Sequence, residues 1–473
     1  MEKVTRRELL RLLGLGSAAA VVAACKPQVV IETVEKIVKE TVVVEGEEKV
    51  VEKIVEVEKE VEAVSYSGEL RAFIAAGAPV EPVHELLATS LMARFPDVTV
   101  KFEYIVGDMA EQMYTRAAAG TLADVVHSAD LFCVPFAYND VTLDLGPWLE
   151  VDPVVDLDDV FESMLGLGTF EGEIHMLPSA LDVVTMYYNK TMMEDAGAEL
   201  PADTWTWDDF TTQMKKVVEM ETDAQGIPVY WGLTNQTWNW WATVYPWIVG
   251  YGGEIRNEDK TQSTWSSEAA LAGLRAYTEL WTEHNIALPL GLDVGGGAFE
   301  LGRAAVWTHI QGLRPHLKSA IEDKFEWDVQ VMPIMPDGRH RTGMGTWGIS
   351  VYSGSQNRDL AYEYVKGIVT PAIQRLLAQR GESVPLLRSV AEDPSWYEGL
   401  QPPPTNFMAY VRGADDAVLP IVDYPADCGS FYTGLVNQSY IAALEAAIRG
   451  QRSVEDAFAE CDEDIQRCLD DYL

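Results

Sequence analysis

The chain has 473 residues, of which 48% are hydrophobic, and its formal net charge is −39 at pH 7. A chain of this size and composition can bury a sizeable core and is expected to split into about two lobes. A surface this acidic repels phosphate backbones, so the composition argues against nucleic acid as a partner.

The N-terminal residues have the pattern of an export signal that is removed from the mature protein. Arg6 and Arg7 form a basic start, and an apolar run over 12–22 follows that is shorter than the roughly 20 residues of a membrane span. Small residues then lead into Cys25, an arrangement that resembles the lipobox of bacterial lipoproteins. We predict a signal peptide over 1–24 and a lipidated Cys25 that anchors the protein to the outer face of the cell membrane or in the periplasm. The twin-arginine and the general export route both stay open, as does an ordinary signal peptide with a chance cysteine.

Residues 25–65 form a segment dominated by valine, glutamate and lysine. Apolar residues recur there at alternating spacings of four and three, as at Val50, Ile54, Val57 and Val61. This spacing is typical of a coiled coil, but each run covers only about two heptads and β-branched valines favour helix weakly. The segment is interpreted either as a solvated tether or as a coiled-coil stalk, and both would lift the remaining chain off a membrane.

From Gly68 onward the pattern becomes that of a globular α/β body. Strand-like and helix-like segments alternate over 70–74, 79–95, 98–104, 108–119 and from Val125. This order predicts a parallel sheet covered by helices. Ligands of open α/β sheets bind at the carboxyl ends of the strands, so 75–78 and 128–130 are candidate cleft segments.

Several motifs of the body resemble those of one protein family, and they follow in that family's order. The first comprises Tyr188, Asn189, Lys190, Pro201, Trp205, Trp207 and Phe210. Further matches lie at 250–254, 299–307, 327–338, 361–365 and 453–458. Together they span roughly 68–470 and look like the signature of the family 1 extracellular solute-binding proteins, which are the periplasmic or lipoprotein components of ABC importers. Thr206 or Asp208 is expected to cap the helix that carries Phe210.

The resemblance implies two α/β lobes that the chain crosses three times, with a cleft between them that closes on a ligand about a hinge. The crossings are expected near 180–184, 343–348 and 392–396. Lobe 1 then comprises 66–182 and 346–393, and lobe 2 comprises 183–345 and 394–473.

The resemblance also implies a function. It implies high-affinity capture of a small solute, most simply a mono- or oligosaccharide, and delivery of that solute to the permease subunits of an ABC transporter. A non-sugar solute such as a glycerol phosphate, a polyamine or a metal complex is the alternative.

Four residues are candidate ligand contacts, and two of them, Asp182 and Trp347, lie at the expected crossings. Asp182 and Asp130 match acids that contact sugar in a maltose-binding member of the family, and a carboxylate suits a polyol because it accepts several hydroxyl hydrogen bonds. Gln311 follows the segment 299–307, which in relatives runs into a loop that lines the cleft, and Trp347 could stack a sugar ring from the other lobe. For each acid, the alternative is a surface position in an acidic protein.

Aromatic residues crowd the segment 238–247, which is expected to be helical. Trp240 or Trp241 lies about one turn from Tyr245, so these rings can form one surface for the apolar face of a sugar. The Asn239 side chain would then form hydrogen bonds with the hydroxyl groups of the sugar. About half of the aromatic residues in the segment are expected in the core. Tyr245 stands where the maltose-binding member has a tryptophan, so the identity of that member's ligand does not carry over.

The cysteines do not form a metal-binding or disulfide-dense pattern. Besides Cys25 they are Cys133, Cys428, Cys461 and Cys468. The last two are seven residues apart in a helical pattern, which separates their Cα atoms by roughly 10 Å, beyond the ~7 Å limit of a disulfide. We interpret both as small buried residues of one helix face and leave the disulfide state of all four open.

No catalytic motif is found in the sequence, and no cofactor or metal is expected. Gly343, Gly345 and Gly348 match the spacing of a dinucleotide-binding loop, but such a loop should open a helix, whereas 347–352 has the pattern of a strand. The chain is therefore not expected to be an enzyme. A cell-surface glycosidase, which needs only two carboxyl groups at a defined distance, and a surface scaffold are the remaining alternatives.

Overall fold

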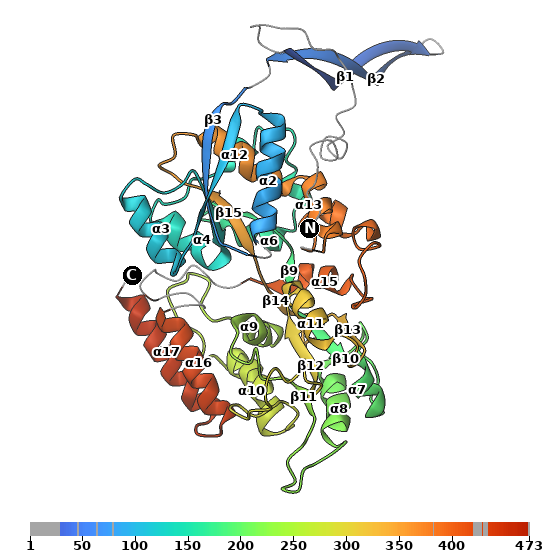
Figure 1. Cartoon of the computed structure of the whole chain (residues 1–473), viewed down its shortest axis with the longest axis vertical. Helices are drawn as coiled ribbons and strands as arrows, with labels where there is room; N and C mark the ends of the chain where they lie inside the picture. The colour runs from blue at the N-terminus through green and yellow to red at the C-terminus, as the bar shows by residue number, and fades with distance from the viewer. Residues whose placement is uncertain are drawn as a thin grey trace. The chain divides into compact units, whose positions relative to one another are not determined.

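The structure is a computed structural model that describes residues 29–44, 47–62, 65–77, 80–381, 383–419, 428 and 434–471. It divides into two units, the first comprising 1–69 and 92–99, the second 70–91 and 100–473. The expected signal peptide and Cys25 lie outside the described residues. Figure 1 shows the elements in chain order by colour.

The first unit contains a pair of antiparallel strands, β1 (Val29–Val44) and β2 (Glu47–Glu62). Their register pairs Val34 with Val57 and Ile37 with Ile54. The coiled-coil alternative is therefore wrong for these strands. The physical reason is that β-branched residues recur along both segments and favour an extended backbone over a helix. That this segment acts as a tether stays a prediction.

A five-stranded sheet, most of which belongs to the second unit, has the strand order β4-β3-β5-β15-β8. Its strands are β3 (Gly68–Ile74), β4 (Val98–Tyr104), β5 (Val125–Ala129), β8 (Leu177–Pro178) and β15 (Trp347–Val351). β3 and β5 run parallel, as the alternating pattern predicts, whereas β15 is antiparallel to β5 and β8. The helices that alternate with the early strands are α2 (Val80–Arg94), α3 (Met109–Ala118) and α4 (Asp130–Tyr138).

A four-stranded sheet in the second unit has the order β11-β12-β10-β13. Its strands are β10 (Thr185–Asn189), β11 (Trp231–Leu233), β12 (Ala304–His309) and β13 (Trp327–Gln330). The accompanying helices are α7 (Lys190–Asp195), α8 (Trp207–Val218), α9 (Trp241–Gly250), α10 (Glu268–Thr282), α11 (Arg314–Ile321), α16 (Gly434–Ile448) and α17 (Val454–Asp470). The apolar faces of these helices, with the exception of α11, share one large core with β10 and β12.

Short elements complete the second unit. They are α5 (Gly146–Leu149), α6 (Glu162–Gly166), α12 (Arg358–Val365), α13 (Pro371–Gln379), α14 (Arg388–Ala391) and α15 (Ala409–Arg412), the strand pair β6 (Thr169–Phe170) and β7 (Glu173–Ile174), and the 3-10 helices η1 (Leu157–Asp159), η2 (Gln311–Leu313), η3 (Lys366–Val369), η4 (Pro394–Trp396) and η5 (Ala414–Asp416).

A small three-stranded sheet links the two larger ones. It consists of β9 (Asp182–Val183), β14 (Thr342–Gly345) and β16 (Ala417–Val418), with β9 antiparallel to β14. β9 lies between β8 of the five-stranded sheet and β10 of the four-stranded sheet, and Thr346 alone separates β14 from β15. Both passages fall where the first two crossings are expected. The lobe boundaries and the third crossing stay predictions.

The start of α8 follows the expected capping pattern. The Thr206 side chain accepts a hydrogen bond from the backbone N–H of Asp209, and the Asp209 carboxylate accepts one from the backbone N–H of Thr206. This reciprocal capping box satisfies two backbone donors that would otherwise lack helical partners. The expected apolar face of α8, carrying Phe210 and Met214, is buried.

Close packing explains two of the three glycines that imitate a dinucleotide-binding loop. A Cβ atom on Gly343 would overlap Ala242 of α9, and one on Gly348 would overlap Met176. The segment that follows Thr346 is strand β15 and not a helix. The rejection of a dinucleotide-binding site is therefore consistent with the backbone, which uses these positions to bring strands close to their neighbours.

One interpretation of the cysteines is wrong. Cys468 is not a packed thiol but forms a disulfide with Cys428, with Cα atoms 5.7 Å apart. The partner was missed because it lies 40 residues away in sequence, and sequence spacing reports only on contacts within one helix. Cys461 is buried in α17 as expected, and Cys133 and Cys461 are free thiols.

Candidate functional site

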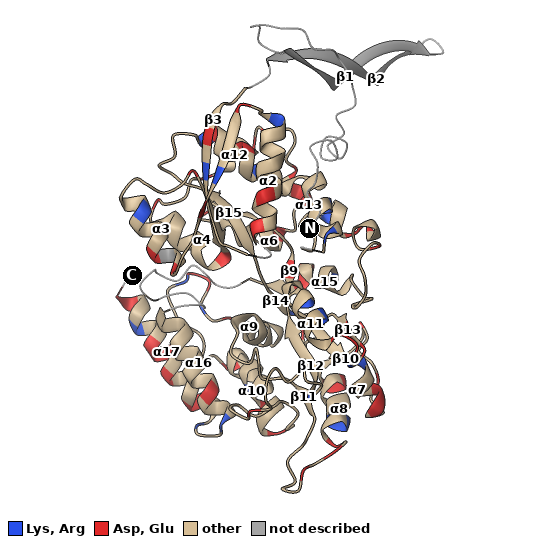
Figure 2. Ribbon diagram, viewed as in Figure 1, with Lys and Arg blue, Asp and Glu red and all other residues tan. Residues whose placement is uncertain are grey.

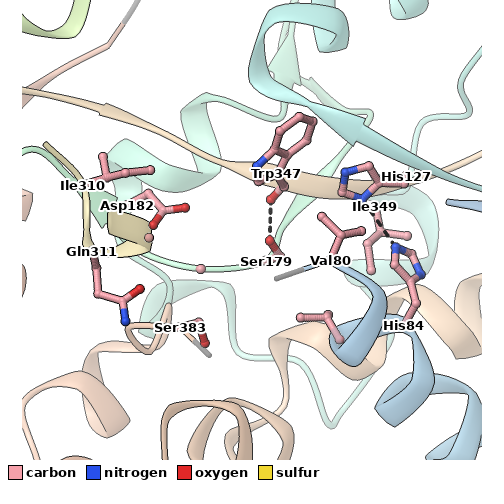
Figure 3. A pocket seen from close by; sticks show the side chains of 13 residues that line it. Val80, His84, His127, Ser179, Asp182, Ile310, Gln311, Trp347, Ile349 and Ser383 are labelled. Carbon is pink, nitrogen blue, oxygen red and sulfur yellow. Dashed lines mark hydrogen bonds between the residues drawn. The ribbon is translucent and has the colours of Figure 1, made fainter. Parts of the chain in front are cut away.

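A cavity of about 240 Å³ lies in the second unit where the five-stranded sheet meets the small linking sheet. It is lined by Val80, Val83, His84, His127, Ser179, Ala180, Asp182, Ile310, Gln311, Gly312, Trp347, Ile349 and Ser383. Figure 3 shows Asp182 and Gln311 on one side and the two histidines on the other, with Ser179 between them. The wall therefore combines aliphatic side chains with a few polar groups, the usual composition of a small-molecule site.

Three of the sequence-predicted residues meet in this pocket. Asp182 is the first residue of β9, Trp347 the first of β15, and Gln311 the first of the 3-10 helix that follows β12. Trp347 pairs with Ala129, the last residue of β5, and Gln311 follows the end of β12, so both lie at the carboxyl end of a strand, where ligands of α/β folds usually bind. Chain segments far apart in sequence thus converge on one cavity.

The carboxylate of Asp182 has unusual electrostatic surroundings. The residue is 9% exposed, and no hydrogen bond or ion pair reaches its carboxylate from the described part of the chain. Burial, aided by the negative charge of Asp130, raises the pKa of Asp182 to about 7. The oxygens of Asp182 are thus available to accept hydrogen bonds from a ligand.

Asp130 supports the linking strands and does not line the pocket. It is the first residue of α4 and is buried, and its Oδ2 accepts a hydrogen bond of 3.0 Å from the backbone N–H of Thr346. The Thr346 hydroxyl in turn donates to the Ala180 carbonyl. The structure therefore places the predicted Asp130 behind the pocket wall, where it acts on Asp182 through its charge.

Trp347 gives the pocket an aromatic surface. Its side chain is 38% exposed, unlike most tryptophans of the chain, and its ring stacks on that of His127 with centroids 5.0 Å apart and an interplanar angle of 28°. The backbone carbonyl of Trp347 accepts a hydrogen bond of 2.6 Å from the Ser179 hydroxyl. Such a partly exposed ring on a fixed strand can pack against an apolar ligand face.

The two pocket histidines are buried and neutral. Burial lowers the pKa of His127 to about 3 and lowers the pKa of His84 well below its usual value. Sequence reasoning missed both residues. His127 directly precedes the strand-end segment 128–130, which was the signal that could have found it.

The predicted aromatic platform on α9 does not line this pocket. Trp241 is 1% exposed and belongs to the core. Tyr245 is also buried, and its hydroxyl donates to Glu254 over 2.6 Å, beside a separate cavity of about 960 Å³. Trp240 precedes α9 and packs on His309, with ring centroids 5.4 Å apart, and the Asn239 carbonyl accepts from Tyr440. Trp241, which was a candidate for the sugar-binding surface, is instead one of the aromatic residues in the core, because α9 packs against both α10 and β14.

The charge of the pocket differs from that of the surface around it. Figure 2 shows Asp and Glu residues on many helices of the second unit. Asp182 is the one acidic residue among the pocket-lining residues, and these include no lysine or arginine. A phosphate or carboxylate ligand would therefore meet no cationic side chain among the described residues that line the pocket.

Among the described residues, no helix is both long enough and apolar enough to span a bilayer. No cluster of three or more histidine, cysteine or carboxylate side chains there has the geometry to hold a metal ion.

Comparisons with known proteins agree on one family. The chain matches the family model of the bacterial extracellular solute-binding proteins over residues 72–375. A putative binding protein of Brucella abortus is 24% identical over 308 residues, which cover 63% of this chain and 71% of the relative.

Solved structures of similar fold include two transport components. An ABC substrate-binding protein of Listeria monocytogenes, in complex with cycloalternan, has a TM-score of 0.69 at 21% identity, covering 86% of this chain and all of that one. The sugar-binding protein MalE of Xanthomonas citri has a TM-score of 0.72 at 18% identity, covering 86% and 98%. The fold is thus the two-lobe fold of periplasmic binding proteins, as the sequence predicts.

Proposed function

Because the chain belongs to the bacterial extracellular solute-binding proteins, we propose that its pocket captures a small sugar or polyol outside the cytoplasm and that the protein delivers it to an ABC import permease. The observation that carries this proposal is the pairing of an unpartnered, buried carboxylate on Asp182 with the partly exposed ring of Trp347 in one cavity. A sugar offers hydroxyl donors for the carboxylate and a C–H face for the ring.

The absence of a lysine or arginine among the lining residues argues against a glycerol phosphate. A phosphate group brought near Asp182 would face repulsion without compensation in a partly dry cavity. A polyamine is the second candidate, since its ammonium group could pair with the Asp182 carboxylate. The salt dependence of binding separates the two candidates, because salt weakens attraction between charges far more than it weakens ring packing.

The structural neighbours support a carbohydrate ligand. One was solved in complex with cycloalternan, and another is described as a sugar-binding protein. The cavity, at about 240 Å³, is smaller than the roughly 300–1,000 Å³ of typical ligand sites, which favours a ligand of monosaccharide size.

We further propose that closure of the two lobes accompanies binding and that β9 and β14 form the hinge. Asp182 and Gly345 are paired neighbours in these strands. A ligand shifts a conformational equilibrium only through a difference in affinity between the two states, so contacts from both lobes are required. Small-angle scattering of the full chain should show a smaller radius of gyration with saturating ligand, and an unchanged radius would contradict the hinge.

The proposed location is the outer face of the cell membrane, through a lipid on Cys25. The Cys428–Cys468 disulfide supports an oxidising compartment outside the cytoplasm. Cys25→Ser should release the protein from membranes into the soluble fraction. A wild-type protein that incorporates no fatty acid in its host would contradict the anchor.

A thermal-shift screen of sugars and polyols on the full chain carrying Cys25→Ser tests the function directly. A bound ligand should raise the unfolding temperature in proportion to its concentration relative to its Kd. The same screen on Asp182→Asn provides the control, because this variant should lose the response. Recovery of the sugar unchanged after binding would distinguish a binding protein from a glycosidase.

A further inference from the structure

The indole of Trp347, on which the proposed function places a ligand, has its neighbours on the adjacent strand of the five-stranded sheet. Trp347 lies opposite Ala129 in the antiparallel pairing of β15 with β5. His127 lies two residues before Ala129, so its side chain points to the same face of the sheet as the indole. This is the face that carries the cavity, since His127, Trp347 and Ile349 all line the pocket.

His127 supplies a ring contact that Ala129 cannot. Ala129 offers a single methyl group, whereas diagonal neighbours in an antiparallel pair lie within reach of aromatic side chains. His127 is such a neighbour, and its ring stacks on the indole with centroids 5.0 Å apart and an interplanar angle of 28° (Figure 3). Trp347 stacks on no other ring in the described part of the chain. His127 is therefore the aromatic support of the indole.

The imidazole of His127 is itself held in place. Its Nδ1 lies 3.4 Å from Nε2 of His84, and Nδ1 of His84 lies 2.9 Å from the Tyr364 hydroxyl. His84 and Tyr364 belong to α2 and α12, and both are buried, as is His127. The support is thus tied to two helices and shielded from solvent, whereas the ring that it supports is 38% exposed.

The stacked pair consists of two flat, neutral rings. Burial lowers the pKa of His127 to about 3, so the imidazole carries no charge at neutral pH. Aromatic rings gain stability from such stacking beyond the area that they bury. A phenyl ring at position 127 would preserve the stacking and lose the polar contact with His84, which makes the two roles of His127 separable.

An exposed ring that is already ordered binds a ligand more tightly than one that has to be ordered first. Immobilising a side chain on binding lowers the affinity, and a ring that is fixed beforehand avoids this cost. The indole nitrogen of Trp347 makes no hydrogen bond in the described part of the chain, where its backbone carbonyl accepts from Ser179. Packing against His127 is therefore the contact that can orient the ring.

We propose that His127 holds the indole of Trp347 in one orientation and leaves the opposite face of the ring open to a ligand. His127 is then a positioning residue that touches no ligand, and His84 and Tyr364 keep its ring in place. The inference rests on the proposed function only in taking Trp347 as a ligand contact.

This role narrows the class of ligand. A fixed indole with one open face fits a ligand whose C–H groups already lie on one side of a rigid ring. A pyranose sugar has such a face before it binds, whereas an open-chain polyol has to be ordered on binding. The support by His127 thus favours a cyclic sugar over the acyclic polyols that the proposed function also allows.

Fluorine NMR measures the order of the ring without any ligand. The full chain carrying Cys25→Ser is labelled with 5-fluorotryptophan, and Trp347→Phe identifies the Trp347 resonance by its loss. We expect one narrow resonance, with a smaller shift between H2O and D2O than that of free fluorotryptophan. Several resonances for Trp347, or a shift as large as that of the free amino acid, would overturn the proposal even if variants at position 127 fail to fold.

Removal of the support should expose the covered face. His127→Val should move the Trp347 resonance toward that of a solvent-exposed fluorotryptophan and enlarge its shift between H2O and D2O. His127→Phe keeps a flat ring and should preserve both values of the wild type. An unchanged resonance in His127→Val, or an equal change in both variants, would contradict a positioning role.

A neighbouring core position separates this role from a general loss of stability. Val126 is also buried in β5, but its side chain points to the opposite face of the sheet from His127. Val126→Ala should therefore lower stability and leave the Trp347 resonance unchanged. A response as large as that of His127→Val would reduce the proposed support to a structural effect.

Two probes with the same number of carbon atoms test the ligand class. D-glucose should move the Trp347 resonance on titration, and His127→Val should weaken this binding by roughly two- to tenfold, the cost of ordering one side chain. D-glucitol, the open-chain counterpart of D-glucose, should bind the wild type more weakly. Equal binding of D-glucose by the wild type and His127→Val, or of both probes by the wild type, would overturn the proposal.

Failure of the proposed function gives a different result. If neither probe nor any sugar of the thermal-shift screen binds while the Trp347 resonance still depends on the ring at position 127, the sugar-binding function fails. The support of the indole by His127 stands in that case.

Discussion

Oδ2 of Asp130 accepts a hydrogen bond from the backbone N–H of Thr346. Thr346 is the single residue between β14 of the linking sheet and β15 of the five-stranded sheet. The same carboxylate contributes to the raised pKa of Asp182. One buried acid thus holds the backbone between β14 and β15 and contributes to the charge state of Asp182. Asp130 was predicted as a ligand contact, but the structure gives it this supporting position instead.

Asp130→Asn should separate these two roles. The amide oxygen still accepts from Thr346 but lacks the charge, so the free energy of unfolding should fall by about 1 kcal/mol. The pKa of Asp182 should fall below its value of about 7, because the neighbouring negative charge is gone. NMR titration of Asp182 measures the second effect, and Asp359→Asn at an exposed position should leave that pKa unchanged.

The stability of the protein without ligand should decrease as pH rises through the titration of Asp182. Its folded-state pKa of about 7 lies above the unfolded value near 3.8, so the native state binds more protons between these values. The resulting loss is on the order of 4 kcal/mol from about pH 4 to about pH 7. Urea denaturation across this range should show the slope in the wild type and not in Asp182→Asn.

A carboxylate with the opposite shift provides the control for that slope. Asp209 is an exposed helix cap, and hydrogen bonds from Thr206 lower its pKa. Above about pH 5 it is ionised in both the folded and the unfolded state, because the usual pKa of an aspartate is 3.8 and the folded value is lower. Asp209→Asn should therefore lower stability at every pH in this range without flattening the slope, and a flattened slope would contradict the assignment to Asp182.

Trp347→Ala should weaken ligand binding without unfolding the protein. The ring is 38% exposed and lines the pocket, so its removal costs packing with the ligand more than packing in the core. The loss of affinity should be about 1 to 3 kcal/mol, by analogy with the burial of one large apolar side chain. Titration by calorimetry measures it, and Trp240→Ala, a half-buried position away from the pocket, should bind as the wild type does.

Trp241→Ala should act on stability instead of binding. Trp241 is 1% exposed and packs in the large core of the second unit. Its truncation leaves a cavity, which should lower the free energy of unfolding by about 3 to 5 kcal/mol. Chemical denaturation checks this value. A loss of less than about 1 kcal/mol, as expected of a surface residue, would contradict the core position of this ring.

The Cys428–Cys468 disulfide should contribute about 4 kcal/mol to the free energy of unfolding, since it closes a loop across a sequence separation of 40 residues in the unfolded chain. Cys428→Ala should lose this contribution. Reductant should destabilise the wild type by a similar amount and should leave Cys428→Ala unchanged, because Cys133 and Cys461 are free thiols. An equal response of both proteins to reductant would contradict the pairing.

Local sequence patterns predicted the elements whose causes are local. The capping box at Thr206 and the alternation of strands and helices through 70–129 depend on neighbours a few residues away, and the structure has both. The parallel pairing of β3 with β5 follows from that alternation. The order of motifs along the chain also identified the family, which the family match over 72–375 confirms.

The pocket could be predicted only in part, because tertiary packing decides which face of an element is covered. Aromatic crowding on α9 resembled a binding surface, yet α10 and β14 bury Trp241. Trp347, with fewer aromatic neighbours in sequence, is the ring at the cavity. His84 and Ser383 reach the pocket from segments with no local signal. The disulfide partner of Cys468 likewise had no local signal in the sequence.

The position of Asp182 in β9 has a mechanical consequence. Asp182 pairs with Gly345, the last residue of β14, and Trp347 begins β15 two residues further along the chain. The carboxylate and the indole are therefore connected through the short passage from the linking sheet to the five-stranded sheet. A change in the angle between these two sheets would change the distance between the two groups, so the groups proposed to touch the solute would themselves move, with no separate lever between detection and movement.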